Sequence, residues 1–186
     1  MISATDLRKG TKILFRDEPH MVLDYHHIKM GRGGAIVRIK IKNLITGSSF
    51  EETFRSAEKF DNADLERKEM QYLYADGDLY NFMDQESYEQ VSLDKGNLED
   101  VIDYLKEQEI YSVLYFKDRP IGVTPPLFMV LTITETTPGV RGDTAQGGAT
   151  KLAALETGLK LQVPLFVNEG DKIRIDTRTG IYIERV

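Results

Sequence analysis

The feature that most constrains the fold of this chain is a long series of short apolar–polar alternations. Runs such as TKILF, AIVRIKIK and FMVLTITET alternate with the two-residue period of a β-strand. Four dipeptides that favour turns interrupt the series: Thr46-Gly47, Asp76-Gly77, Glu169-Gly170 and Thr179-Gly180. Many short strands with such interruptions favour small barrels over one doubly wound sheet. The sequence therefore predicts an all-β fold.

Two segments break the strand pattern with helical signals. In NLEDVIDYLKEQEI, Asn97 suits a helix N-cap and acidic residues crowd the first turn. Four apolar residues recur with the spacing of one helix face: Leu98, Val101, Ile102 and Leu105. We expect a helix here that closes the open end of a barrel or spans between strands. Residues 56–62, SAEKFDN, predict a short helical turn.

Two junctions are expected to divide the chain into three small β-barrel domains. The first junction follows the SAEKFDN segment, near residue 63. The second is stiffened by Pro125-Pro126, because proline fixes φ and disfavours helix in the residue before it. The 186 residues suffice for three such units. We therefore expect domains at residues 1–63, 64–126 and 127–186.

Composition excludes several classes of protein. The chain has no cysteine, so it can form neither a disulfide framework nor a thiolate nucleophile or metal site. The N-terminal stretch MISATDLRKG lacks the apolar core of a signal peptide, and no apolar run approaches the ~20 residues of a membrane span. These features predict a soluble, cytoplasmic protein with no membrane partner.

The charge is distributed unevenly along the chain. The formal net charge of −6 argues weakly against a nucleic-acid partner. However, residues 1–62 hold 11 Lys and Arg against 8 Asp and Glu, residues 63–126 hold 6 against 15, and residues 127–186 hold 7 of each. Screening confines each field to ~10 Å at ordinary salt. An extended molecule can therefore present a basic and an acidic face separately.

The basic charge concentrates in KMGRGGAIVRIKIK, residues 29–42, within a stretch from Tyr25 to Phe50 that has no Asp or Glu. Gly31, Gly33 and Gly34 surround Arg32, whose guanidinium offers a planar fork of donors suited to phosphate. Four further cations flank this tip and could contact an RNA backbone: Lys29, Arg38, Lys40 and Lys42. The pattern favours phosphate binding with a steep salt dependence. The alternative is a hairpin turn with a solvated arginine.

A second glycine-rich segment, PGVRGDTAQGGATK, spans residues 138–151. It again displays a cation, Arg141, among small polar residues, and its backbone amides could bind phosphate or base edges. The alternative is a long flexible loop between strands.

Signals for catalysis are weak. The three histidines, His20, His26 and His27, lack metal-ligand spacing, and we find neither a nucleophile motif nor a convincing pair of catalytic carboxylates. Four aromatic residues resemble a base-stacking set, but the acids around them favour core packing instead: Tyr72, Tyr74, Tyr80 and Phe82. The sequence thus predicts no enzyme activity, no metal and no cofactor.

Longer motifs run along the whole chain: MGRGGA, KNLITG, TFRS, LYADGDLYNFMD, VTPP, PGVRGDT, LETG, VPLFV and DTRTG. Residues 151–170, KLAALETGLKLQVPLFVNEG, also have the Lys, Gly, Val-Pro and Gly spacing of a C-terminal signature. On these motifs the chain resembles the bacterial translation elongation factor P family. The resemblance implies an L-shaped mimic of tRNA, with an N-terminal SH3-like (KOW-like) barrel followed by two OB-fold barrels.

The resemblance also implies a function. Such a factor binds the ribosome and its rRNA beside the peptidyl-tRNA, especially prolyl-tRNA, and stimulates peptide-bond formation at consecutive prolines. It acts as a monomer by positioning the CCA end of the tRNA. By the same resemblance, Arg32 contacts that CCA end, and Tyr182 and Arg185 lie near the stem of the peptidyl-tRNA. The codon of the mRNA in the exit site is approached by Arg141, Gly142, Asp143 and Thr144.

The chain departs from the best-known members at the tip. Arginine in place of lysine argues against the lysine-extension route, and other members carry a rhamnose on this arginine. Arg32 is therefore a candidate substrate of a modifying glycosyltransferase, and the sequence leaves open whether it is modified or bare. Met30 stands where a proline often precedes the first glycine, and Leu152 replaces another common proline.

Two other functions compete with this interpretation. A non-catalytic ribosome- or RNA-binding SH3/OB module would explain the basic tip but not the match along the whole chain. A small β-barrel enzyme lacks a candidate base or nucleophile.

Overall fold

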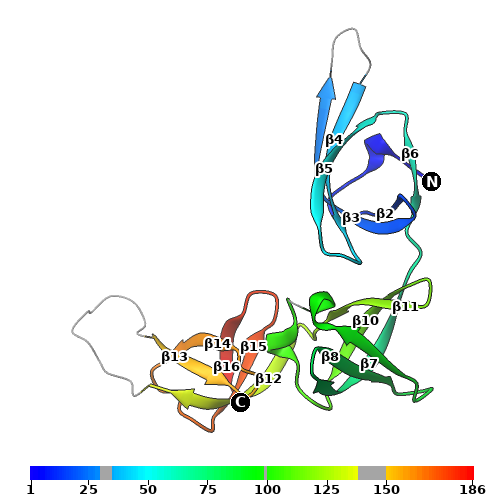
Figure 1. Cartoon of the computed structure of the whole chain (residues 1–186). Helices are drawn as coiled ribbons and strands as arrows, with labels where there is room; N and C mark the ends of the chain where they lie inside the picture. Colours follow the sequence, from blue (N-terminus) through cyan, green and yellow to red (C-terminus); the bar gives the residue numbers. More distant parts are fainter. Residues whose placement is uncertain (30–34, 99, 138–149) are drawn as a thin grey trace, which may run out of the picture.

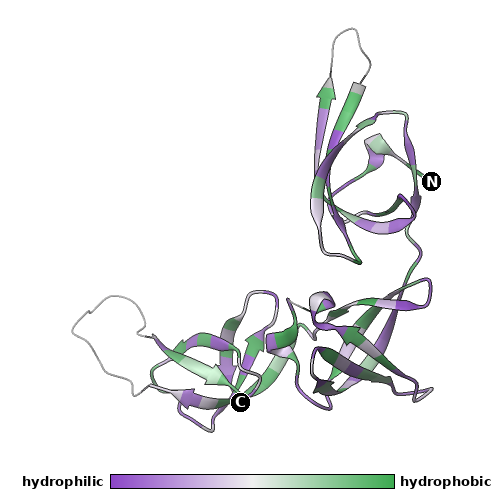
Figure 2. Ribbon diagram, in the orientation of Figure 1, coloured by the Kyte–Doolittle hydropathy of each residue, from purple (hydrophilic) through white to green (hydrophobic). Residues whose placement is uncertain are grey.

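The computed structural model describes residues 1–29, 35–98, 100–137 and 150–186, and within them three antiparallel sheets form an L (Figure 1). The first barrel makes one arm, and the second and third barrels lie side by side in the other. The all-β prediction is confirmed, as is the L-shaped arrangement of three small barrels. Figure 2 shows hydrophobic and hydrophilic stretches alternating along the strands of all three.

The first barrel is a six-stranded sheet in the order β1-β6-β2-β3-β4-β5. Its elements are β1 (Ile2–Ser3), the 3₁₀ helix η1 (Ala4–Asp6), β2 (Lys12–Phe15), β3 (Glu18–Lys29), β4 (Ala35–Asn43), β5 (Ser49–Arg55) and β6 (Lys59–Asn62). The apolar members of the alternating runs form its core, which includes the fully buried Ile13, Val22, Val37, Ile39 and Ile41.

The second barrel is a five-stranded sheet in the order β11-β10-β7-β8-β9. Its strands are β7 (Leu65–Asp76), β8 (Leu79–Asp84), β9 (Gln90–Asp94), β10 (Ile110–Phe116) and β11 (Arg119–Thr124). Two 3₁₀ helices lie between β9 and β10: η2 (Lys95–Asn97) and η3 (Ile102–Tyr104).

The third barrel is a five-stranded sheet in the order β14-β13-β12-β15-β16. Its strands are β12 (Phe128–Thr136), β13 (Thr150–Leu155), β14 (Lys160–Pro164), β15 (Lys172–Asp176) and β16 (Ile181–Arg185). Among the described residues, no helix has the length and apolar character to span a membrane.

The predicted turns take the backbone shape that glycine permits. The four predicted turn glycines all have positive φ: Gly47 at 74°, Gly77 at 60°, Gly170 at 85° and Gly180 at 67°. Two hairpins use pairs without glycine, Arg16-Asp17 and Lys117-Asp118, in which both residues have positive φ as a two-residue hairpin turn of the I′ class requires. Neither pair contains the glycine that marks the four predicted turns.

The predicted helix beginning at Asn97 is wrong. Among the residues of this segment that the structure describes, the helical turns are only the short 3₁₀ turns η2 and η3, and Leu105 already has extended dihedrals. The helical ladder cannot continue because the backbone N–H of Lys106 donates to the hydroxyl of Tyr111 at 2.8 Å. The apolar spacing nevertheless indicated which residues are buried, since Leu98, Val101 and Leu105 all lie in the core.

The short helical turn predicted at residues 56–62 is also wrong. Residues 56 and 57 form a turn, but Lys59–Asn62 is strand β6, which pairs with β1 and β2. Phe60 of this strand packs edge-on against Phe54, with ring centroids 4.8 Å apart. Closing the first barrel around this aromatic pair outweighs the weak local preference for a helical turn.

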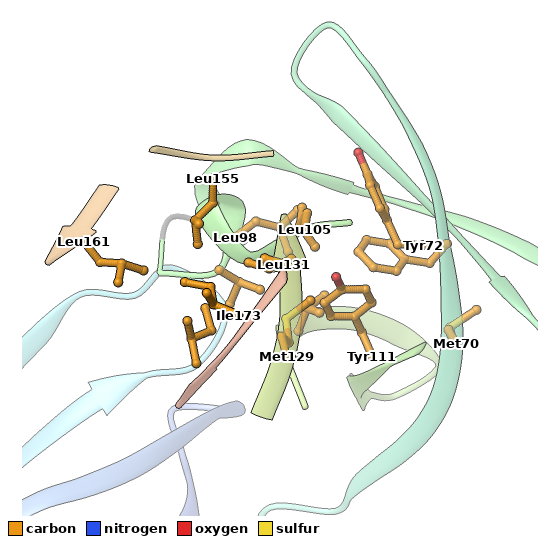
Figure 3. Packing of buried hydrophobic residues seen from close by; sticks show 14 of the residues in the cluster. Met70, Tyr72, Leu98, Leu105, Tyr111, Met129, Leu131, Leu155, Leu161 and Ile173 are labelled. Carbon is orange, nitrogen blue, oxygen red and sulfur yellow. The ribbon is translucent and has the colours of Figure 1, made fainter. Parts of the chain in front are cut away.

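The buried side chains of the described residues form two separate clusters. One lies entirely in the first barrel. The other is continuous across the second and third barrels, and Figure 3 shows Leu98 and Leu105 close to Leu131 of β12, with Met129 beside Tyr111. The segment between β9 and β10 thus packs between two barrels rather than capping one.

Candidate nucleic-acid interface

The β3–β4 hairpin extends beyond the rest of the first barrel (Figure 1). Its two strands pair as far as Lys29 opposite Ala35, whereas the neighbouring strand β5 ends at Arg55, opposite Ile36. Residues 30–34 join the two strands and lie outside the described residues. The predicted tip residues, Arg32, Gly31, Gly33 and Gly34, belong to this segment, and the side chain of Lys29 is likewise not described. The described hairpin therefore provides the support for that tip.

The cations of β4 lie on the outer face of the barrel. Val37, Ile39 and Ile41 are fully buried, and the intervening Arg38 and Lys40 are exposed. Lys42 is half-buried at the far end of the strand. At ~3.3 Å per residue, the row from Arg38 to Lys42 spans about 13 Å, so it offers spaced contacts rather than one anion site.

Neighbouring strands change the electrostatics of this row. Lys40 lies opposite Asp24 of β3 and opposite Glu51 of β5, so carboxylates flank it on both sides. The backbone N–H of Tyr25 and the nearby His26, 3.2 Å away, hold the pKa of the Asp24 carboxyl below its usual value, which keeps it anionic. The acid-free stretch in the sequence therefore does not make an acid-free surface.

Arg38 has different neighbours from Lys40. It lies opposite His26 of β3 and Thr53 of β5, with no carboxylate in register with it. Of the described cations on β4, Arg38 is thus the one whose positive charge is least compensated by the neighbouring strands. It is also the one nearest the tip.

Lys42 lies at the elbow of the L instead. Its Nζ is 3.9 Å from Oδ2 of Asp100, which belongs to the second barrel. A cleft of about 720 Å³ separates the first and second barrels at this point, lined by the β4–β5 turn and by residues of η2, β10 and β11. Although Lys42 continues the alternation of Arg38 and Lys40, the fold places it beside an acid at the end of β4 away from the tip.

The second predicted loop joins β12 to β13. Its residues Arg141, Gly142, Asp143 and Thr144 lie outside the described residues. The strands that carry it are well tied together, since Thr136 pairs with Ala153 and the Thr136 hydroxyl donates to the carbonyl of Leu152 at 3.1 Å. The two strands that flank this loop are therefore held together on the third barrel.

The predicted C-terminal contact residues lie on β16. Tyr182 is half-buried against the core, whereas Arg185 is about half exposed. The guanidinium of Arg185 lies 5.6 Å from the ring centre of the exposed Phe166, and its Nη1 is 3.4 Å from Oδ2 of Asp171. An arginine held over an aromatic ring presents a planar cation and a stacking surface together, which suits RNA.

Phe166 and Asp171 are missing from the sequence-based set of site residues. The backbone N–H of Asn168, 2.8 Å away, and Arg185 lower the pKa of the Asp171 carboxyl, so this acid stays ionised and holds the guanidinium. Phe166 lies in the apolar run VPLFV, which does not indicate that its side chain is exposed. Without that exposure, Phe166 could not be recognised as a site residue from the sequence.

The aromatic residues of the second barrel that resembled a base-stacking set differ in their burial. Tyr72 and Phe82 are buried in the core, as predicted, and Tyr80 packs against it. Tyr74 is instead 49% exposed. His20 is buried with its ring edge-on to Phe15 and Phe50, and among the described residues no cluster of His, Asp or Glu could hold a metal ion.

Comparisons with known proteins match all three barrels to one family. Residues 3–60 match the elongation factor P KOW-like domain, residues 65–123 match the elongation factor P OB domain, and residues 129–185 match the elongation factor P C-terminal domain. The first two matches agree with the SH3-like and OB assignments made from the sequence.

Curated relatives match over the full length. Elongation factor P of Thermoanaerobacter sp. (strain X514) is 53% identical over 186 residues, covering 100% of both chains. Elongation factor P of Alkaliphilus oremlandii is also 53% identical with the same coverage. Among solved structures, eukaryotic translation initiation factor 5A from Methanococcus jannaschii superposes with a TM-score of 0.56 at 19% identity, over 67% of this chain and 93% of that one. That likeness supports the fold.

Proposed function

Because the chain belongs to the elongation factor P family, a family of translation factors, we propose that it binds the ribosome beside the peptidyl-tRNA and stimulates peptide-bond formation at consecutive prolines. In this proposal it works in the cytoplasm as a monomer and without a cofactor. The family supplies the general role, and the proposal adds the substrate and the step.

The observation that carries the proposal is the β3–β4 hairpin. It projects beyond the first barrel and ends in the MGRGGA segment, whose single cation is Arg32. In the proposal Arg32 meets the CCA end of a prolyl-tRNA, while Lys29 and Arg38 contact the RNA backbone behind it. Lys40 and Lys42 contribute less, because Asp24, Glu51 and Asp100 lie beside them.

The proposed mechanism is positioning rather than bond chemistry. Proline is a rigid, poor nucleophile, and a proline-rich nascent chain draws the reacting ester out of line. Holding the CCA end in an attack-ready pose accelerates the reaction by orientation. Each factor of ten in rate corresponds to ~1.4 kcal/mol of barrier, so a few contacts from the tip are sufficient for a large effect.

The third barrel is proposed to hold the factor in register with the tRNA and mRNA. Arg185, stacked on Phe166, and Tyr182 contact the stem of the peptidyl-tRNA. The loop of Arg141, Gly142, Asp143 and Thr144 contacts the codon in the exit site. The third barrel and the first barrel lie in different arms of the L, so in the proposal the two arms engage different parts of the same complex.

A reconstituted translation assay of a polyproline template tests the proposal. Mass spectrometry of the peptide containing Arg32, from the native cell, first determines whether a glycosyltransferase has extended the tip, and the assay then uses that form. We expect Arg32→Ala to reduce polyproline synthesis at least tenfold, since it removes the group that meets the tRNA end.

The control variant is Arg119→Ala, an exposed arginine of the second barrel, which should leave synthesis unchanged. Synthesis from a template without prolines should respond to neither variant. Full polyproline activity of Arg32→Ala would rule out the proposed role of the tip. Binding to free RNA as strong as binding to ribosomes that hold a peptidyl-tRNA would favour a general RNA-binding module instead.

A further inference from the structure

The elbow between the first and second barrels contains few contacts. Two side-chain interactions cross it among the described residues. One is the Lys42–Asp100 pair at 3.9 Å, and the other is a hydrogen bond from the Asn97 side chain to the carbonyl of Ile45, at 3.3 Å. The cleft of about 720 Å³ lies between the same segments of the two barrels. The angle of the elbow therefore depends on very few groups.

Asn97 connects the two barrels through one amide nitrogen. Its Nδ2 donates to the carbonyl of Ile45 in the first barrel and to the carbonyl of Ile121 in the second, each at 3.3 Å. A side-chain amide has two N–H donors, so both bonds can form at once. Because one side chain makes both bonds, a single substitution of Asn97 removes this connection, and both distances are at the long end for such bonds.

The Ile45 carbonyl is held in place from within the first barrel. Asn43 is buried, and its Oδ1 accepts hydrogen bonds from the backbone N–H groups of Ile45 at 2.8 Å and Thr46 at 3.0 Å. The N–H of Leu44 donates to the carbonyl of Pro19 at 2.9 Å. The β4–β5 turn therefore presents a fixed acceptor to Asn97.

Asn97 is equally well anchored on its own side. The next residue, Leu98, is fully buried in the core that the second and third barrels share. Its N–H donates to the carbonyl of Lys95 at 3.0 Å, closing the turn of η2. Any movement of the first barrel relative to this core must therefore change the Asn97–Ile45 contact.

The Lys42–Asp100 pair is the weaker of the two connections. The side chain of Asp100 is 91% exposed and that of Lys42 36% exposed, and exposed ion pairs at such distances contribute little because water and salt screen them. The hydrogen bond from Asn97 to Ile45 is also exposed, but it is directional, and the same amide is anchored by its partly buried bond to Ile121. The hydrogen bond to Ile45 is thus the more specific constraint on the elbow.

A small rotation at the elbow would move the tip a long way. β4 runs from the tip to the elbow over nine residues, about 30 Å at ~3.3 Å per residue. A rotation of roughly 10° about its base would displace the far end by about 5 Å, whereas a misplacement of ~1 Å can cost ~100-fold in rate. We propose that Asn97 is a positioning residue: it sets the angle between the barrels and so the position of the tip during the proposed reaction.

The positional part of this inference can be measured on the free protein. The chain has no cysteine, so nitroxide labels at Lys59→Cys in the first barrel and Lys160→Cys in the third, both exposed, report one inter-barrel distance. We expect a broader or shifted distance distribution in Asn97→Ala and Asn97→Asp, both of which remove the donor.

The matched control is Asn81→Ala. The amide of Asn81 donates to the carbonyl of Tyr74 within the second barrel, so this variant should leave the distribution unchanged. Distributions of both Asn97 variants identical to that of the unsubstituted chain would overturn the inference.

The functional part rests on the proposed function. At saturating factor, Asn97→Ala should lower the maximal rate of polyproline synthesis several-fold, with a smaller change in the concentration that gives half-maximal stimulation. A merely structural role would instead lower the melting temperature and the amount of active protein. If the unsubstituted chain fails to stimulate polyproline synthesis, the proposed function falls while the distance measurement still tests Asn97. A changed distance with an unchanged maximal rate would overturn the positioning role alone.

Discussion

Asp176 and Arg178 form the most tightly bonded ion pair of the third barrel. The backbone N–H and Nε of Arg178 lie 2.9 and 3.0 Å from Oδ1 of Asp176, and Nη2 bonds to Oδ2. These side-chain hydrogen bonds are the main reason that the pKa of Asp176 falls to about 2. The pair fixes the turn between β15 and β16.

This pair makes acid stability depend on Arg178. A carboxyl whose folded pKa is depressed adds stability above its unfolded pKa, near 3.8, and that contribution is lost as the pH falls toward about 2. In Arg178→Ala the guanidinium bonds disappear, so the pKa of Asp176 should rise and acid unfolding should begin at a higher pH. A carbon-detected NMR titration of Asp176 and an acid titration followed by circular dichroism measure both effects. Arg119→Ala serves as the control. An unchanged Asp176 titration would show that the guanidinium does not cause the shift.

The surroundings of single residues were the hardest part of the interface to predict. The alternation of β4 correctly indicated that Arg38 and Lys40 share the outer face. It could not indicate that Asp24 and Glu51 lie opposite Lys40, because that depends on strand register and on the bulge between Val22 and Asp24. The same limit applies to Phe166 and Arg185, which are far apart in the sequence and meet only in the folded barrel.

Among the elements, the β15–β16 turn of the third barrel lies beside Tyr104 of the second. Gly180 has φ +67°, and a Cβ placed there would lie 3.3 Å from the hydroxyl of Tyr104. Gly77, in the turn between β7 and β8, has φ +60° and open space around it. The two glycines therefore share a backbone requirement and differ in their neighbours.

Alanine substitutions at Gly77 and Gly180 distinguish the cost of the positive φ from the cost of the contact with Tyr104. Gly77→Ala should cost ~1–2 kcal/mol of unfolding free energy, because a residue with a Cβ is disfavoured at this φ. Gly180→Ala should cost about 1 kcal/mol more, since Tyr104 must also move. Urea unfolding curves of the two variants give the comparison. Equal costs would mean that Tyr104 yields freely and that the contact is unimportant.

Elements were predictable where local pattern and tertiary packing agree. The strands with clear alternation, such as β4 and β12, and the four glycine turns were found. Residues 97–110 were assigned to a helix because their apolar spacing fits one helix face, but the packing between two barrels needs only short 3₁₀ turns there. Strand β7 begins with LERKE, whose charges conceal it, and only its pairing with β8 and β10 makes it a strand.

At the scale of the whole molecule, the residues that the structure describes form two hydrophobic cores for three barrels. The first barrel has a core of its own, whereas the second and third share one. An ion pair reinforces that shared region, because Nζ of Lys106 lies 3.1 Å from Oε1 of Glu156 and donates to the carbonyl of Val130 at 3.2 Å. The domain division at residues 63 and 127 stays a prediction. The cores indicate that the barrels on either side of residue 127 are packed together, whereas those on either side of residue 63 have separate cores.

This difference predicts which parts of the chain a core mutation destabilises. Leu131→Ala, at a fully buried position of β12, should cost ~2–5 kcal/mol through the lost burial and the cavity left behind. Because Leu131 lies in the shared core, amide hydrogen exchange should accelerate throughout residues 64–186 and remain unchanged in residues 1–62. The converse variant, Ile39→Ala in the fully buried core of the first barrel, should accelerate exchange only in residues 1–62.

Mass spectrometry of exchanged peptides distinguishes this arrangement from its alternatives. Faster exchange confined to residues 127–186 in Leu131→Ala would mean that the third barrel opens by itself despite the shared core. Faster exchange across the whole chain would mean that the elbow transmits unfolding between the arms. The few contacts at the elbow, against the continuous packing between the second and third barrels, lead us to expect two cooperative units: a mobile arm that carries the tip and a rigid arm of two barrels that orients it.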